Sequence, residues 1–191
     1  NIKQYPKDTL FSRLGVDIND ANEVAKNHIK VQEFINQNKK SFQFLKTHFG
    51  LVAMNGYSFT NLENTLGAIY IVRDPRDIIL SYAHHNNQSI EETANKIKGN
   101  YMQAITDKHK VPIYTGSWSF NYNSWKVLKK HKRYLLIKYE DLIKDKKENF
   151  KKILIFIKYL TKMNFEIDDY KISKIIDEID FEKLKKLEIK Y

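Results

Sequence analysis

The stretch that decides the fold covers residues 67–85 and reads GAIYIVRDPRDIILSYAHH. Its first part, GAIYIV, is apolar and β-branched, which predicts a buried parallel strand. Asp74 stands directly before Pro75, a pair that favours a helix N-cap and first helical position, and we expect this helix to run to about His85. A strand, a charged turn and a helix thus follow one another, as in the repeating unit of α/β folds.

The same alternation extends to both sides of this stretch. Helical spacing and capping signals predict helices at about 21–38, 89–107, 118–130, 141–160, 172–179 and 181–189. Short strands are expected at 41–46 and 134–139, and loops at 49–65 and 110–117. The chain has no internal repeat and no low-complexity linker, so we expect residues 1–191 to form a single α/β domain with a parallel sheet.

The composition is that of a compact globule with an anionic partner. With 42% hydrophobic and 29% charged residues, and only six Gly and three Pro, the chain is neither a linker, a collagen nor a disordered acidic tail. The net charge of +10 favours binding of an anion. Most of the basic residues are lysines, which we expect to form a solvated surface; the rare arginines, among them Arg73 and Arg76, carry more information.

The chain contains no cysteine, which excludes disulfides, thiolate metal sites and a cysteine nucleophile. This is compatible with a reducing compartment, and we expect a cytoplasmic location. The longest apolar run is far shorter than the roughly 20 residues that span a bilayer, so no membrane span is expected. Because the first residue is Asn1 rather than Met, we expect the sequence to begin inside a longer gene product.

Ligands of open α/β sheets bind at the carboxyl ends of the strands, and unusual residues follow three of the expected strands. They are Lys46-Thr47-His48, the turn from Arg73 to Asp77, and Tyr139-Glu140-Asp141. At the second group a helix N-terminus offers free N–H groups, and Arg73 can add a bidentate clamp, which predicts a phosphate site. The alternative is a capped turn whose charges pair only with one another.

The order of motifs narrows this choice. RDPRDIILSY, with LKTH upstream and with GSW and YEDL downstream, resembles the sulfotransferase family that uses 3'-phosphoadenosine 5'-phosphosulfate (PAPS). The resemblance runs from Lys46 to about Glu188. It implies a P-loop-NTPase-like three-layer fold, with a central parallel sheet flanked by helices. It also implies transfer of a sulfuryl group to a hydroxyl, or less often an amine, of a small-molecule or carbohydrate acceptor, which leaves 3'-phosphoadenosine 5'-phosphate (PAP).

The resemblance also implies roles for individual residues. Arg73 and Ser81 correspond to the ligands of the 3'-phosphate. His48 corresponds to the general base that takes the proton of the acceptor, and Lys46 to the partner that helps hold the transferring sulfuryl group. These residue types suit an in-line displacement, in which positioned cations and a base near its ordinary pKa supply most of the catalysis. Such a scheme requires no metal, and the sequence has no convincing metal-ligand spacing.

At the adenine, the resemblance assigns Tyr139 to a position beside the ring and Phe181 to the aromatic residue that stacks on it. Ile179 stands where the family usually has a hydroxyl, which leaves one adenine contact open. After GSW the family often has a histidine, whereas this chain has Asn121 and Asn123. The contacts of the acceptor are therefore not predicted.

Two phosphate-binding segments of the family are not matched. The Pro-Lys-Ser-Gly-Thr-Thr loop has only a faint counterpart in Tyr5-Pro6-Lys7, since Asp8 and Leu10 replace residues that the loop needs. We expect no strand before this stretch and no helix after it, and interpret the likeness as coincidence. The late Arg-Lys-Gly segment would follow Tyr191. The chain is therefore expected to be a sulfotransferase domain that lacks both ends.

Other interpretations remain open. The main alternative is a nucleotide- or polyanion-binding basic module without catalysis, although the lysines are spread over all the expected helices rather than confined to one face. A P-loop kinase relative would fit the fold, but the chain has no Walker A loop. We expect no specific nucleic-acid partner. For Tyr139 the alternative is a core aromatic residue at a strand end, and for His48 an ordinary surface histidine.

Overall fold

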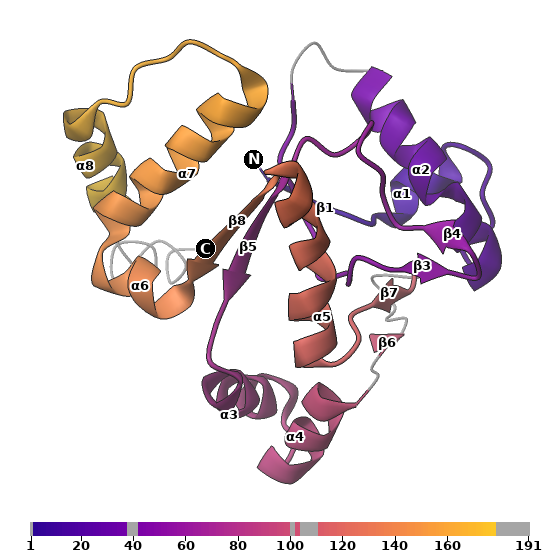
Figure 1. The fold of residues 1–191 in the computed structure, drawn as a ribbon. Coiled ribbons are helices and arrows are strands. Elements are labelled where there is room, and N and C mark those ends of the chain that lie inside the picture. Colours follow the sequence, from indigo (N-terminus) through magenta and orange to yellow (C-terminus); the bar gives the residue numbers. More distant parts are fainter. Residues whose placement is uncertain (1, 38–41, 100–101, 104–110, 179–191) are drawn as a thin grey trace. The chain divides into compact units, whose positions relative to one another are not determined.

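The computed structural model describes residues 2–37, 42–99, 102–103 and 111–178 (Figure 1). It divides into two compact units. Unit 1 comprises Asn1–Ala68 and Asp74–Tyr134, and unit 2 comprises Ile69–Arg73 and Leu135–Tyr191. The described strands form four two-stranded sheets, and each unit is considered by itself below.

Unit 1 begins with strand β1 (Lys3–Gln4), which pairs in parallel with β2 (Leu45–Lys46). The short helix α1 (Asp8–Ser12) and the long helix α2 (Ala21–Gln37) lie between them in the sequence. Helix α2 was predicted, but β2 is shorter than the strand expected at 41–46. The prediction that no strand precedes and no helix follows Tyr5-Pro6-Lys7 was wrong, because β1 and α1 occupy these places.

An aromatic cluster around a histidine forms the core of unit 1. His28 of α2 is 2% exposed. The rings of Phe11, Phe49 and Phe59 surround it, with centroids 5.1–5.3 Å from that of its imidazole. The Tyr5 hydroxyl donates to the His28 carbonyl oxygen at 3.0 Å and lies 3.2 Å from Nδ1 of the same residue. Burial lowers the pKa of His28 to about 4, so its ring is neutral at physiological pH.

A short β-hairpin lies within the loop expected at 49–65. Strands β3 (Ala53–Met54) and β4 (Tyr57–Ser58) pair in antiparallel fashion. Both turn residues have positive φ, 51° at Asn55 and 84° at Gly56, as the preferred two-residue hairpin turn requires. The Asn55-Gly56 dipeptide is a typical signal of such a hairpin, and the prediction did not use it.

Two helix boundaries in unit 1 also differ from expectation. Helix α4 (Ile90–Lys98) has the predicted capping box of Ser89 and Glu92, but it ends at Lys98 rather than near residue 107.

Strand β6 (Met102–Gln103) pairs with β7 (Ile113–Tyr114), so part of the loop expected at 110–117 is a strand. Helix α5 (Trp118–Trp125) continues as the 3-10 helix η1 (Lys126–His131), in place of one regular helix.

The sheet of unit 2 consists of β5 (Ala68–Val72) and β8 (Tyr134–Lys138), whose arrows point the same way in Figure 1. Helices α6 (Tyr139–Lys144), α7 (Lys146–Thr161) and α8 (Asp169–Glu178) follow. The single helix expected at 141–160 is broken at Asp145, where φ is −142° and ψ is 82°. The Asp145 carboxylate accepts a hydrogen bond from the Glu148 N–H at 2.9 Å and so caps α7.

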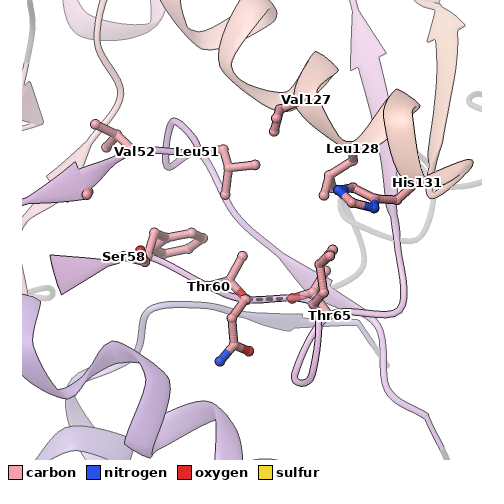
Figure 2. Close-up of a pocket in the computed structure, with 12 residues that line it drawn as sticks. Leu51, Val52, Ser58, Thr60, Thr65, Val127, Leu128 and His131 are labelled. Carbon is pink, nitrogen blue, oxygen red and sulfur yellow. Dashed lines mark hydrogen bonds between the residues drawn. The ribbon is translucent and has the colours of Figure 1, made fainter.

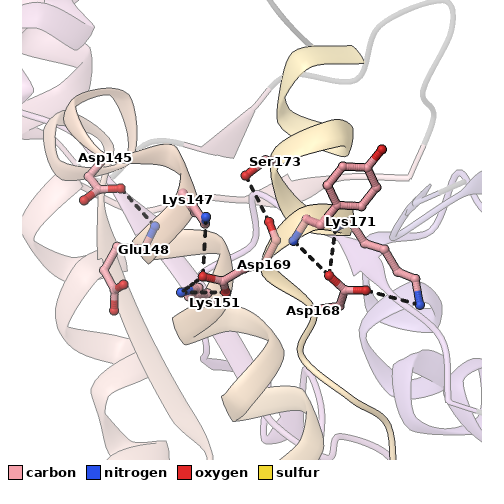
Figure 3. A network of polar contacts seen from close by, with 9 residues as sticks. Asp145, Lys147, Glu148, Lys151, Asp168, Asp169, Lys171 and Ser173 are labelled. Atoms are coloured by element: carbon pink, nitrogen blue, oxygen red, sulfur yellow. Dashed lines mark hydrogen bonds and ion pairs between the residues drawn. The ribbon is translucent and has the colours of Figure 1, made fainter.

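Helices α7 and α8 are joined by an exposed ion-pair network (Figure 3). The Asp169 carboxylate accepts from Lys151 Nζ at 2.7 Å and lies 3.4 Å from Lys147 Nζ. The neighbouring Asp168 carboxylate accepts hydrogen bonds from the backbone N–H groups of Tyr170 and Lys171, at 2.8 and 3.1 Å. These two bonds set the start of α8. Among the described helices, none is long and apolar enough to cross a membrane.

Candidate functional site

The turn that follows β5 has the predicted local structure. Asp74 caps helix α3 (Pro75–Asn86), because its carboxylate accepts the Arg76 N–H at 2.9 Å, and Pro75 is the first helical residue. The Arg76 guanidinium also donates to both Asp74 oxygens, with Nη2 2.6 Å from Oδ2. These hydrogen bonds lower the pKa of Asp74 to about 2. Charge pairing within the turn, the alternative interpretation, is thus correct for Asp74 and Arg76.

Arg73 and Tyr139 lie together in unit 2. Each comes directly after one of the two paired strands, β5 and β8. The guanidinium carbon of Arg73 lies 4.7 Å from the centroid of the Tyr139 ring, which is within the range of a cation–π contact. The Tyr139 side chain is 37% exposed, so the ring is not the buried core aromatic of the alternative interpretation. A cation and an accessible aromatic face are therefore combined at this end of the strands.

The structure does not bring the remaining predicted cofactor ligands together with Arg73 and Tyr139. Ser81 is exposed on α3 and belongs to unit 1, whereas Arg73 belongs to unit 2. A phosphate site shared by these two residues therefore stays a prediction. Phe181 and Ile179 lie outside the described residues, so the proposed stacking on the adenine also stays a prediction.

Lys46 is the last residue of β2 in unit 1, and His48 lies two residues after it. The Tyr5 N–H donates to the Lys46 carbonyl oxygen at 2.8 Å and fixes the backbone there, while both side chains remain exposed. Desolvation lowers the pKa of the His48 imidazole below its ordinary value, and the positive charge of Lys46 lowers it further. The ring is therefore neutral, and able to accept a proton, at a lower pH than a free histidine.

Asn121 is a site neighbour whose contact the sequence did not predict. Its side-chain amide donates to the His48 carbonyl oxygen at 3.1 Å. The only signal was the position of Asn121 shortly after GSW, and residues so far apart in the sequence meet only through the tertiary fold. In the described part of the chain, no three His, Cys, Asp or Glu side chains group closely enough to hold a metal ion.

Unit 1 also contains a pocket of about 280 Å³, shown in Figure 2. Leu51 and Val52 line one side of it, and Leu128 and His131 of η1 line another. At its base the hydroxyls of Thr60 and Thr65 are 2.6 Å apart and share a hydrogen bond. None of the predicted site residues is among the residues that line this pocket.

Comparison with known proteins identifies the relatives of the chain. The model of the family described as "Sulfotransferase domain" matches residues 6–191. Human sulfotransferase 1C2 is 26% identical over 123 residues, which cover 64% of this chain and 38% of the relative. Mouse sulfotransferase 2A1 is 28% identical over 121 residues, which cover 63% of this chain and 40% of the relative. The chain thus spans well under half the length of these relatives.

Solved structures show the same fold. Mouse sulfotransferase SULT7A1, complexed with PAP, superposes with a TM-score of 0.57 at 22% identity, over 78% of this chain and 50% of that chain. Retinol dehydratase, in complex with androsterone and the inactive cofactor PAP, gives a TM-score of 0.55 at 19% identity, over 86% of this chain and 49% of the other. These likenesses confirm the predicted P-loop-like α/β fold.

Proposed function

The chain belongs to the sulfotransferase domain family, and from this premise we propose that it transfers a sulfuryl group from PAPS to a hydroxyl or amine of a small-molecule or carbohydrate acceptor. The observation that carries the proposal is the contact of Arg73 with Tyr139 at the ends of two paired strands. A guanidinium beside an accessible aromatic ring suits a ligand that combines a phosphate with a flat base.

The proposed nucleotide site combines the turn with both strand ends. Arg73 would hold the 3'-phosphate, because its guanidinium can donate two parallel hydrogen bonds to phosphate oxygens. The N-terminus of α3 would add the positive end of its helix dipole, although its Arg76 N–H already donates to Asp74, and Ser81 would add a hydroxyl. Tyr139 would lie against the adenine, with Phe181 stacked on the same ring. Both solved relatives named above bind PAP, which supports this ligand class.

The transfer itself would depend on His48 and Lys46. The His48 imidazole takes the proton of the acceptor hydroxyl as the oxygen of that group bonds to sulfur. The bond between sulfur and the 5'-phosphate oxygen breaks at the same time, and the electron pair leaves with the phosphate. The Lys46 ammonium offsets the negative charge on the sulfuryl oxygens. The lowered pKa of His48 supports this role, since it keeps the base neutral near pH 7.

The nucleotide site is tested by thermal stabilisation. We expect PAP to raise the melting temperature more than ATP, and an oligonucleotide to have no effect, because only PAP combines a single nucleotide with a terminal 3'-phosphate monoester. Arg73→Ala and Ser81→Ala should weaken the shift, whereas Arg13→Ala removes one exposed arginine elsewhere and should preserve it. Equal shifts with all three ligands would instead support a basic module that binds polyanions without selectivity.

The catalytic role is tested separately, in a transfer assay with the full-length gene product. His48→Ala should still bind PAP but lose turnover by about 10²-fold or more, the range of a general base. Turnover that survives this substitution would remove His48 as the base, whatever the nucleotide measurements show.

A further inference from the structure

Three side chains of helix α5 bond the backbone of the proposed base and of the residues that follow it. The Asn121 amide donates to the His48 carbonyl oxygen at 3.1 Å, and the Trp125 indole N–H donates to the Phe49 carbonyl oxygen at 3.0 Å. Ser124 Oγ accepts the Leu51 N–H at 2.9 Å. All three side chains come from one face of α5, because residues three and four apart are neighbours on a helix.

Asn121 also ties this segment to the chain that leads into α5. The same Nδ2 donates to the Thr115 carbonyl oxygen at 2.8 Å, so its two hydrogens bond two carbonyl groups from separate segments. The strand before α5 adds a fourth bond, from the Gly50 N–H to the Tyr114 carbonyl oxygen at 2.8 Å. The backbone from His48 to Leu51 is thus bonded at every residue.

The GSW motif at residues 116–118 helps explain why α5 can lie close to the segment that follows His48. Gly116 has a φ of 67°, a conformation that favours glycine, and Ser117 caps α5 by accepting the Phe120 N–H at 3.2 Å. The Phe120 ring packs against both Gly50 and Gly116, where a Cβ atom would crowd it. The two glycines and the Ser117 cap let the helix approach the segment that follows His48.

Phe49 anchors the same segment from the inside. It is 1% exposed, and its ring stacks on Phe59 with centroids 4.2 Å apart and planes 9° apart. His48, the preceding residue, is exposed. The backbone is therefore hydrogen-bonded on both sides of the exposed His48 side chain, at the Lys46 carbonyl by Tyr5 and at the His48 carbonyl by Asn121.

We propose that Asn121 is a positioning residue that fixes the backbone of His48 and so orients the imidazole of the base. The inference rests on the proposed function only for the role of His48; the hydrogen bonds themselves are independent of that role. An amide is required because two donors on one nitrogen must reach two carbonyl oxygens. Leucine has nearly the same shape but no donor.

The experiment follows the six histidine rings of the 191-residue chain by NMR across a pH titration, with His48 assigned from His48→Gln. In Asn121→Leu the His48 pKa should rise toward its ordinary value of 6.5, because a loosened segment is better solvated. His28, in the core, should keep its low pKa. Asn123→Leu, an exposed position on the same helix, should change neither ring.

Two results would overturn the inference: an unchanged His48 pKa in Asn121→Leu, or an equal change at His28, which would indicate general loosening of unit 1. In the transfer assay Asn121→Leu should lower kcat about tenfold without changing KM for PAPS, since it removes only part of the contribution of the base. If His48→Ala keeps its turnover, the role of the base fails, and the NMR titration still decides whether Asn121 fixes His48.

Discussion

The guanidinium of Arg73 lies over the ring of Tyr139 at 4.7 Å, although one residue directly follows β5 and the other begins α6. Strand pairing alone brings them together, since β5 and β8 are neighbours in one sheet. The contact holds the arginine side chain at the end of the strands, where the proposed nucleotide site requires a cation. The first prediction concerns this pair.

Tyr139→Leu should destabilise the protein by about 0.5–1 kcal/mol, the usual contribution of a cation–π contact at an exposed site, and should weaken PAP binding. Tyr139→Phe retains the aromatic face and should leave both properties nearly unchanged. Urea unfolding measures the first effect and calorimetric titration with PAP the second. Equal losses in the two variants would show that the hydroxyl, rather than the ring, is the important group.

Gly116→Ala should be more damaging than Gly15→Ala, although both glycines have nearly the same φ, 67° and 71°. The left-handed conformation costs any residue with a Cβ roughly 1–2 kcal/mol. At Gly116 the new methyl group also meets the Phe120 ring, whereas at Gly15 nothing lies within 4 Å. Overpacking of this kind costs a further 1–3 kcal/mol or so.

Chemical denaturation of the two alanine variants measures the difference. A double variant, Gly116→Ala with Phe120→Ala, removes the crowding and should recover the additional loss, relative to Phe120→Ala alone. If the two single variants are equally destabilised, the Phe120 ring does not limit the approach of α5.

Lys46→Met should raise the pKa of His48. Desolvation and the Lys46 charge both disfavour the imidazolium form, so removal of the charge leaves only the first effect. The acid limb of the transfer rate, which reports the base becoming neutral, should move to higher pH. The measurement is the NMR titration of the His48 ring, with Lys3→Met as the control, since Lys3 is another exposed lysine of unit 1. A fall in the pKa would contradict the electrostatic argument.

His28 should make stability depend on pH between 6.5 and 4. Its pKa is lowered to about 4 by burial, so the unfolded chain binds more protons than the folded chain in this window. The free energy of unfolding should therefore be highest above pH 6.5, and it should fall by about 3 kcal/mol as the pH drops to 4. Unfolding curves at several pH values measure this decrease.

His28→Phe is the matched variant, because a phenyl ring suits the aromatic cluster and does not titrate. The Tyr5 hydroxyl keeps its bond to the backbone carbonyl of residue 28. The difference in pH dependence between the two proteins isolates His28 from the carboxylates. Parallel curves would show that the pKa of His28 is the same in the folded and the unfolded protein.

Local rules predicted the strand–turn–helix unit at residues 67–85, because a proline and a capping aspartate act on adjacent residues. The same rules failed where two separate helices follow one another. One helix was expected over 141–160, but Asp145 ends α6 and caps α7, so the stretch forms two helices. The hairpin at Asn55-Gly56 was missed because its strands are only two residues long.

The candidate site was predictable only in part, for a related reason. Arg73 and Tyr139 could be placed together because the ends of parallel strands share one edge of a sheet. The bond from Asn121 to His48 depends on how α5 packs on a distant segment, and no short-range pattern records that packing. The most informative contact of the proposed base was therefore available only from the fold.

Strand β5 has a consequence for how the protein is made. It belongs with unit 2, yet the ribosome synthesises it before half of unit 1 and long before β8. Among the described strands its partner is β8, so this edge of β5 stays unpaired until β8 has been synthesised and is a site for misassociation of the nascent chain. A fragment that begins at Leu135 would lack one strand of its own sheet, so the C-terminal unit is not a separable module.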